Sequence, residues 1–306
     1  MTMQIRNEGT YNSLIAQLDK VARHNRQGSY RTKERYYKAM KRFCRFLAEE
    51  YHLQKLANIA PKHLNAYIQK LQAEGKSAST IKTDLAAIRF FHDKMDAKHS
   101  LPGNDNLAVK LERRHFGGVD RTWSRREFGL FLCKCWEASH EDYAAVATLT
   151  YYAGLRIHEC FRLDTAAAEN ALRTGAITIK GKGGKIRSVP TNESIHIELK
   201  KMLAVTPRGH KLFVPDDMPT HIAINRFQQF ICAVRDEIQD LDSTRPMTHH
   251  GLRHTYAART YQKLIGKGVS PADAHYQVSH LLGHERPDVT DIYLASLDPK
   301  EGGPKG

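Results

Sequence analysis

Residues 248–261, THHGLRHTYAARTY, contain the densest group of side chains in the sequence that could do chemistry. Four basic side chains lie within six positions at the start of an alanine-rich helical segment: His249, His250, Arg253 and His254. A metal site, a structural corner of backbone-bonded side chains, or a phosphate pocket would each explain this crowding. A metal is least favoured, because no glutamate follows His250 as in the zinc motif H-E-x-x-H and Arg253 would place a fixed cation beside the ion. The stretch alone leaves the other two explanations open.

Two other stretches carry cations suited to binding a phosphate. Arg156 follows Gly154, which ends a predicted helix, and it opens the next helix, where a guanidinium and N-terminal amides both favour an anion. Lys182 lies at the tip of a predicted β-hairpin, GKGGK, from which its ammonium group can swing over a bound phosphate. Both have ordinary alternatives, since Arg156 could pair with Glu159 or Asp164 and Lys182 could be a solvated turn residue.

Two further motifs lie near the C-terminus: LLGH, which ends at His284, and IY, which ends nine residues later at Tyr293. Taken alone, Tyr293 is one of 13 tyrosines and an ordinary helix residue. In chain order, however, AGLR, GKGGK, HxLRHT, LLGH and IY resemble the tyrosine recombinase (bacteriophage integrase) family. The segment GKSASTIKTDLAAIRFFHDKM resembles that family's N-terminal core-binding domain, so the resemblance covers nearly the whole chain. One fragment is weak evidence, but five in order are hard to obtain by chance.

The resemblance implies a catalytic role for six residues: Arg156, Lys182, His250, Arg253, His284 and Tyr293. The two arginines match the pair that clamps the scissile phosphate, and His250 matches the histidine three residues before the second arginine. Lys182 matches the hairpin lysine, and His284 matches a position taken by histidine or tryptophan. Tyr293 matches the nucleophile.

Other positions agree less closely with the family pattern. Glu159 lies where the family often has an acidic residue that supports the site. The pattern gives His249 and His254 no chemistry, so we interpret them as neighbouring structure and as packing. The interval of 31 residues from the second arginine to His284 is longer than usual, and we expect the excess near LIGKGVSPADAHYQ. Only 13 residues follow the tyrosine, too few for the long C-terminal helix with which many relatives contact a neighbouring subunit.

The chemistry of phosphodiester cleavage agrees with these roles. Two guanidinium groups neutralise the phosphate oxygens as charge develops. An unperturbed tyrosine has a pKa of about 10 and is mostly protonated at neutral pH, so it needs a base or a strongly positive field. His250 can accept the proton while the arginines supply the field, and Lys182 is the natural donor to the leaving 5′-oxygen. The product, a 3′-phosphotyrosyl bond, keeps the energy of the phosphodiester. Rejoining therefore needs no ATP, and we expect no metal and no other cofactor.

The charge of the chain is unevenly distributed. Its net charge is +14, but residues 1–114 hold 22 Lys and Arg against 11 Asp and Glu, whereas the rest holds 25 against 22. A basic first third indicates a polyanionic partner, and double-stranded DNA is favoured. The predicted DNA contacts lie on two helices of this part: Arg31, Lys33, Arg35, Lys38, Lys41, Arg42 and Lys82.

The predicted fold is mainly α. Residues 1–112 read as a bundle of four amphipathic helices, 113–120 as a linker, and 121–306 as a mostly helical catalytic domain. A capping box, SRRE, with Ser124 and Glu127, starts the second domain. The only strand signal is AITIKGKGGKIRSVP, which alternates β-branched and polar residues on both sides of the glycine turn and so predicts a β-hairpin.

The remaining composition narrows the class of protein. No apolar run approaches the roughly 18 residues of a membrane span, and the five cysteines are odd in number and scattered, so we expect a cytoplasmic protein associated with the bacterial nucleoid in use. The family resemblance implies a homotetramer on two synapsed DNA sites, with accessory DNA-bending proteins as further partners. Integration or excision of a mobile element is the favoured task. A type IB topoisomerase-like enzyme and a catalytically silent DNA-binding accessory protein stay open as alternatives.

Overall fold

The computed structural model describes residues 6–24, 30–112, 119–181, 184, 186–241, 243–283 and 288–297. The chain divides into two compact units, residues 1–115 and 116–306. Each unit has its own hydrophobic core. Within the described ranges, no helix is both long and apolar enough to cross a membrane.

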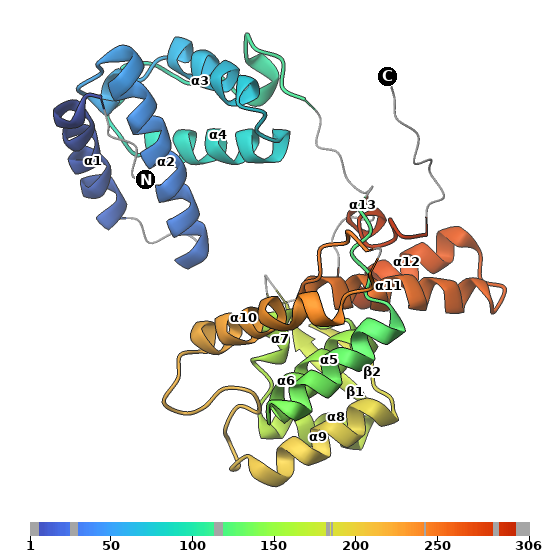
Figure 1. Cartoon of the computed structure of the whole chain (residues 1–306). Coiled ribbons are helices and arrows are strands. Elements are labelled where there is room, and N and C mark those ends of the chain that lie inside the picture. The colour runs from blue at the N-terminus through green and yellow to red at the C-terminus, as the bar shows by residue number, and fades with distance from the viewer. Residues whose placement is uncertain are drawn as a thin grey trace. The chain divides into compact units, whose positions relative to one another are not determined.

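The first unit contains the four helices that the periodicity predicts: α1 (Glu8–Arg23), α2 (Tyr30–Tyr51), α3 (Pro61–Ala73) and α4 (Ala78–His92). Met40, Phe43 and Leu47 form the stripe of α2 that is fully removed from solvent. α3 begins at its proline, whose missing N–H costs nothing in the first turn. Figure 1 shows these helices packed into one bundle.

The second unit contains nine helices and one hairpin among its described residues. Its helices are α5 (Arg125–Glu137), α6 (Glu141–Ala153), α7 (Ile157–Cys160), α8 (Thr165–Thr174), α9 (Glu193–Val205), α10 (Thr220–Ile238), α11 (His249–Ile265), α12 (Pro271–Leu282) and α13 (Asp288–Asp291). The predicted capping box is present at α5, where Ser124 Oγ accepts from the Glu127 amide at 3.1 Å and Glu127 accepts from the Ser124 amide at 2.7 Å.

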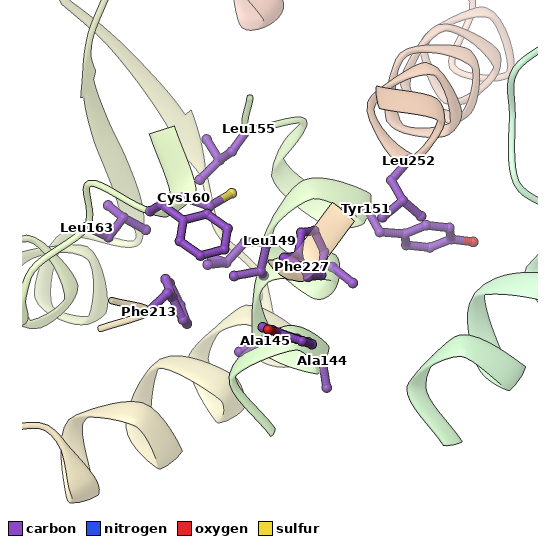
Figure 2. Packing of buried hydrophobic residues seen from close by; sticks show 14 of the residues in the cluster. Ala144, Ala145, Leu149, Tyr151, Leu155, Cys160, Leu163, Phe213, Phe227 and Leu252 are labelled. Carbon is purple, nitrogen blue, oxygen red and sulfur yellow. The ribbon is translucent and has the colours of Figure 1, made fainter. Parts of the chain in front are cut away.

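α6 is the central helix of this unit. Nine of its thirteen positions are apolar or aromatic, and its alanines let α5, α9 and α11 approach closely. Figure 2 shows Ala145 and Leu149 of α6 close to Phe227 of α10, and Tyr151 of α6 beside Leu252 of α11. This close packing fixes the turn that follows α6, which leads to Arg156, and the start of α11 at His249.

The hairpin is formed by β1 (Ala176–Lys180) and β2 (Ile186–Pro190), paired antiparallel from Ala176 with Pro190 to Lys180 with Ile186. Burial alternates along both strands as their sequences predict. In β2 the two inward positions are Arg187 and Val189. The prediction of a mainly α fold with one small antiparallel sheet is confirmed.

Candidate active site

The start of α11 is fixed against the segment that precedes α5. Thr248 caps the helix by accepting from the Gly251 amide, and Trp123 Nε1 donates to the Thr248 carbonyl at 3.0 Å. The Trp123 amide also donates to Thr255 Oγ1 at 2.7 Å. A Cβ at Gly251 would lie 2.3 Å from the Arg121 carbonyl oxygen, so only glycine allows this approach. The crowded histidines and arginine therefore project from a helix end with a well-determined position.

Arg253 is fully buried and lies at the centre of the site. Its guanidinium donates to the carbonyls of Gly154 and Leu282, and it lies 5.5 Å from the centre of the Tyr293 ring. Burial and the nearby charge of Arg156 lower the pKa of Arg253 to about 10, against an opposing hydrogen bond with Tyr293. The guanidinium is therefore cationic at neutral pH and supplies a fixed positive charge beside the tyrosine.

Gly154 lies between the two arginines of the site, because its carbonyl contacts Arg253 and it precedes Arg156 by two residues. It is the C-cap of α6 and has a left-handed backbone, φ +61°, which glycine adopts without strain. A Cβ there would come within 2.3 Å of the Tyr256 ring. The close contact aims the Gly154 carbonyl at Arg253 and starts the turn that places Arg156 two residues later, at the N-cap of α7.

Arg156 forms the ion pair with Glu159 that the sequence left as an alternative. Its Nη1 donates to Glu159 at 3.0 Å, its amide donates to the same carboxylate at 2.8 Å, and its Nη2 donates to the Gly283 carbonyl at 3.4 Å. The side chain is nonetheless 31% exposed. An ion pair and a phosphate pocket are thus compatible here, because Glu159 holds one edge of a guanidinium that still meets solvent.

Arg187, on β2, is a site residue that the sequence reasoning missed. Both of its terminal nitrogens donate to Glu159, at 3.0 and 2.7 Å, and its Nε donates to the Leu281 carbonyl at 3.1 Å. Burial works to raise the pKa of Glu159, but the hydrogen bonds and charges of Arg187 and Arg156 outweigh it and lower that pKa to about 2. The strand alternation, which puts Arg187 on the buried face, is the signal that could have found it.

The C-terminal end of α12 is the common acceptor of all three arginines. Successive carbonyls take one guanidinium each: Leu281 from Arg187, Leu282 from Arg253 and Gly283 from Arg156. The unsatisfied carbonyls of a helix end carry partial negative charge. α12 therefore gathers three cations that would otherwise repel one another, and it does so directly before the segment that leads to α13.

Tyr293 lies against the histidines and the buried arginine of its own chain. Its side chain is largely buried, and its ring stacks on His254 at 4.4 Å and 21° between planes. The His250 ring meets it edge-on at 5.2 Å, with Arg253 at 5.5 Å. A small separate core of Tyr256, Ala257, Val278, Leu282 and Tyr293 holds this tyrosine against α11 and α12. One chain thus brings together the predicted nucleophile, both predicted arginines and the predicted histidine base.

The three histidines of the motif differ in their surroundings. His249 is buried and shares a 2.6 Å hydrogen bond with Thr150, which fits its interpretation as neighbouring structure. His254 is packed, as interpreted, but the partner is the Tyr293 ring itself, and its buried Nε2 has no hydrogen-bond partner among the described residues. His250 is exposed, yet the protein crowded around the ring and the charges of nearby arginines lower its pKa to about 4.

The buried histidines predict how stability depends on pH. Burial lowers the pKa of His249 and of His254 to about 3, whereas the unfolded chain takes up both protons near pH 6.5. Their contribution is therefore complete above pH 6.5 and is lost as the pH falls towards 3, by about 1.4 kcal/mol per pH unit for each histidine. Urea unfolding at pH 7, 6 and 5, followed by the two tryptophans, Trp123 and Trp136, measures this slope. His254→Phe keeps a stacked ring without the proton and should reduce the slope by one proton; an unchanged slope would contradict the assignment.

Two of the six predicted catalytic residues, Lys182 and His284, lie outside the described residues, and their placement in the site stays a prediction. The same holds for the side chain of Arg31. No group of three or more His, Cys, Asp or Glu residues suited to a metal ion occurs in the described part of the chain.

Five of the seven predicted DNA contacts have local partners in the first unit. Arg42 donates to the buried Asp84 at 2.6 Å, and Lys38 pairs with Glu34 at 2.7 Å. Others reach neighbouring groups: Arg35 donates to Thr83, Lys82 to the Glu112 carbonyl, and Lys41 lies over the Tyr37 ring. Arg42 remains half exposed despite its fork to Asp84. These residues stay predicted contacts, with Arg42 also holding α2 to α4.

Comparison with known proteins shows to which family this chain belongs. A model described as phage integrase family matches residues 131–300, more than half of the chain, and one described as phage integrase, N-terminal, matches residues 11–97. The chain belongs to the phage integrase family. It is a tyrosine-type site-specific DNA recombinase, as its sequence motifs predict.

Members of the family with known names align along most of this chain. Tyrosine recombinase XerC of Brucella suis is 26% identical over 273 residues, which cover 84% of this chain and 82% of the relative. Tyrosine recombinase XerD of Halalkalibacterium halodurans is 21% identical over 294 residues and covers 93% of each.

Solved structures of the family share the fold. A lambda integrase dimer bound to a COC′ core site superposes with a TM-score of 0.65 at 16% identity, covering 96% of this chain and 79% of that one. XerH site-specific recombinase bound to palindromic difH substrate, in a post-cleavage complex, gives 0.60 at 20% identity, covering 96% and 86%.

Proposed function

We propose that this recombinase cuts and rejoins double-stranded DNA through a 3′-phosphotyrosyl intermediate at Tyr293. The observation that carries the proposal is the packing of the Tyr293 ring against Arg253 and His250 of the same chain. A tyrosine whose neighbours are a fixed cation and a neutral imidazole has the field and the proton acceptor that nucleophilic attack requires. We infer from the same packing that each subunit cleaves with its own tyrosine.

The proposed reaction assigns each group one task. The Tyr293 oxygen bonds to phosphorus as the bond from phosphorus to the 5′-oxygen breaks, and reversal by another 5′-hydroxyl rejoins the strand. His250, with its lowered pKa, is neutral at pH 7 and accepts the tyrosine proton. Arg156 and Arg253 oppose the charge that develops on the phosphate. Lys182 is proposed to protonate the leaving oxygen and His284 to complete the pocket.

The proposed partners are DNA, indicated by the basic charge of the first part of the chain, and further copies of this chain, indicated by a related structure. We propose residues 1–112 as the core-binding domain, 113–120 as linker and 121–306 as catalytic domain, with the basic first part contacting phosphates. Affinity for DNA should then fall steeply with salt. The lambda integrase neighbour forms a tetramer on a Holliday junction, and we propose a homotetramer on two synapsed sites here. Accessory DNA-bending proteins and the integration or excision of a mobile element belong to the same proposal.

A strand-exchange assay tests the function. DNA fragments from around the coding region are incubated with the protein in EDTA, and the fragment that becomes protein-linked is recovered. Two differently labelled copies of it, one on a supercoiled plasmid, then serve as substrates. We expect recombinant molecules that carry both labels. Relaxed plasmid without recombinants would favour a topoisomerase-like enzyme, and binding without either product would favour a silent accessory protein.

A further inference from the structure

Arg187 connects three parts of the site, and the proposed mechanism does not use it. It is located on β2, the strand that leaves the hairpin turn, and its side chain is only 8% exposed. Its two terminal nitrogens hold both oxygens of Glu159, while its Nε holds the Leu281 carbonyl of α12. One side chain therefore links the hairpin, the helix that begins at Arg156 and the end of α12.

The contacts use features that only arginine has. Its planar fork matches a carboxylate in two parallel hydrogen bonds, and the remaining Nε–H points sideways to a third acceptor. A lysine at position 187 would offer one ammonium group for acceptors that lie in different directions. Since the site is buried, water cannot replace the lost donor, and each acceptor left without a hydrogen bond would destabilise the folded state.

Gly283 shows how closely α12 rests on this arginine. Gly283 has a left-handed backbone, φ +63°, and a Cβ there would lie 3.0 Å from Arg187 Cδ and 3.1 Å from its Nη1. The Gly283 carbonyl in turn accepts from Arg156 at 3.4 Å. Arg156 is thus positioned from two sides, by Glu159 and by the end of α12, and Arg187 contacts both.

We propose that Arg187 is a positioning residue that sets the orientation of Arg156 by fixing Glu159 and the C-terminal end of α12 together. The proposal rests on the proposed function, in which Arg156 binds the scissile phosphate. Arg187 does not touch the substrate, because it is buried beneath Glu159 and Gly283. Its removal leaves Arg156 as the one side-chain partner of Glu159 among the described residues and releases one carbonyl of α12, so Arg156 loses its defined direction.

The role is tested by measuring single-turnover cleavage with the Arg187→Ala variant. The substrate is the DNA duplex to which the wild-type protein becomes covalently linked. We expect the cleavage rate to fall about 100-fold, as for a misplaced catalytic group, with DNA affinity unchanged because Arg187 makes no phosphate contact. Guanidinium chloride at millimolar concentration should restore part of the rate by occupying the vacated space. Arg173→Met, which removes an exposed arginine whose one described side-chain bond is to Asn170, is the control and should behave as wild type. Wild-type cleavage by Arg187→Ala, or equal losses of rate and affinity, would overturn the proposal.

A second readout needs no DNA and separates the two proposals. The ¹⁵N–¹H signal of Arg156 Nε, assigned with Arg156→Lys, should be sharp in wild type and in Arg173→Met but averaged in Arg187→Ala. An Arg156 signal that is the same in Arg187→Ala as in wild type would refute positioning, whatever the enzyme does to DNA. Absence of protein-linked DNA with wild type would instead refute the proposed function, and the Arg156 signal would still decide the role of Arg187.

Discussion

Arg253→Lys is expected to reduce DNA cleavage by about 100- to 1000-fold, the effect of losing one donor that stabilises developing charge. Lysine keeps the positive charge, but a single ammonium cannot donate to the Gly154 and Leu282 carbonyls as the buried fork of Arg253 does. The substitution should also lower the free energy of unfolding by about 1–3 kcal/mol for each carbonyl left without a donor. Single-turnover cleavage and urea unfolding measure the two effects.

Arg259→Lys is the control for this substitution. Arg259 lies on the same helix, α11, but is exposed and stacks over Tyr151 at 4.5 Å. Its replacement by lysine should leave cleavage and stability close to wild type. Cleavage by Arg253→Lys at the rate of Arg259→Lys would show that the fork is unnecessary and would remove Arg253 from the centre of the site.

Gly154→Ala is expected to be strongly destabilising, for two separate reasons. The left-handed backbone at this position, φ +61°, costs a non-glycine residue about 1–2 kcal/mol. In addition, the new Cβ would lie 2.3 Å from the Tyr256 ring, and overpacking of this kind costs about 1–3 kcal/mol more. The shift should also move the carbonyl that Arg253 contacts, so cleavage should fall along with stability.

Gly175→Ala separates the two causes. Gly175 ends α8 with a similar backbone, φ +71°, but a Cβ there would meet nothing within 4 Å. It should lose only the backbone contribution, about 1–2 kcal/mol. Urea midpoints followed by tryptophan fluorescence report on both variants, because Trp123 and Trp136 belong to the second unit. Equal losses in the two variants would mean that Tyr256 yields to the added methyl group.

Local sequence signals predicted most of what positions the site. The helix-ending Gly154 located the end of α6, the alanine-rich segment after the histidines located α11, and alternation around the glycine turn located the hairpin. The rule that glycine ends a helix placed Arg156 at the start of α7, where the structure has it. These features depend on residues close together in the chain, which is why a single sequence carries them.

The contacts that join the elements could not be predicted in the same way. Glu159 and Arg187 are 28 residues apart, and nothing near either residue names the other as its partner. The three carbonyls at the end of α12 carry no side-chain identity, so no residue type signals that they collect three arginines. His254 was interpreted as packing because the motif could not show that its neighbour in space is Tyr293, 39 residues later.

Covalent trapping tests the central claim most directly. Wild type and Tyr293→Phe are incubated in EDTA with DNA from around the coding region, and SDS-resistant adducts are digested to identify the linked residue. The account predicts adducts with wild type joined at Tyr293 through a 3′-phosphate and none with Tyr293→Phe. A mixture of Tyr293→Phe with Arg253→Lys should give no more adducts than Arg253→Lys gives alone. Adducts that persist in Tyr293→Phe would place the nucleophile on another tyrosine, and adducts restored by mixing would show that one subunit lends its tyrosine to the next.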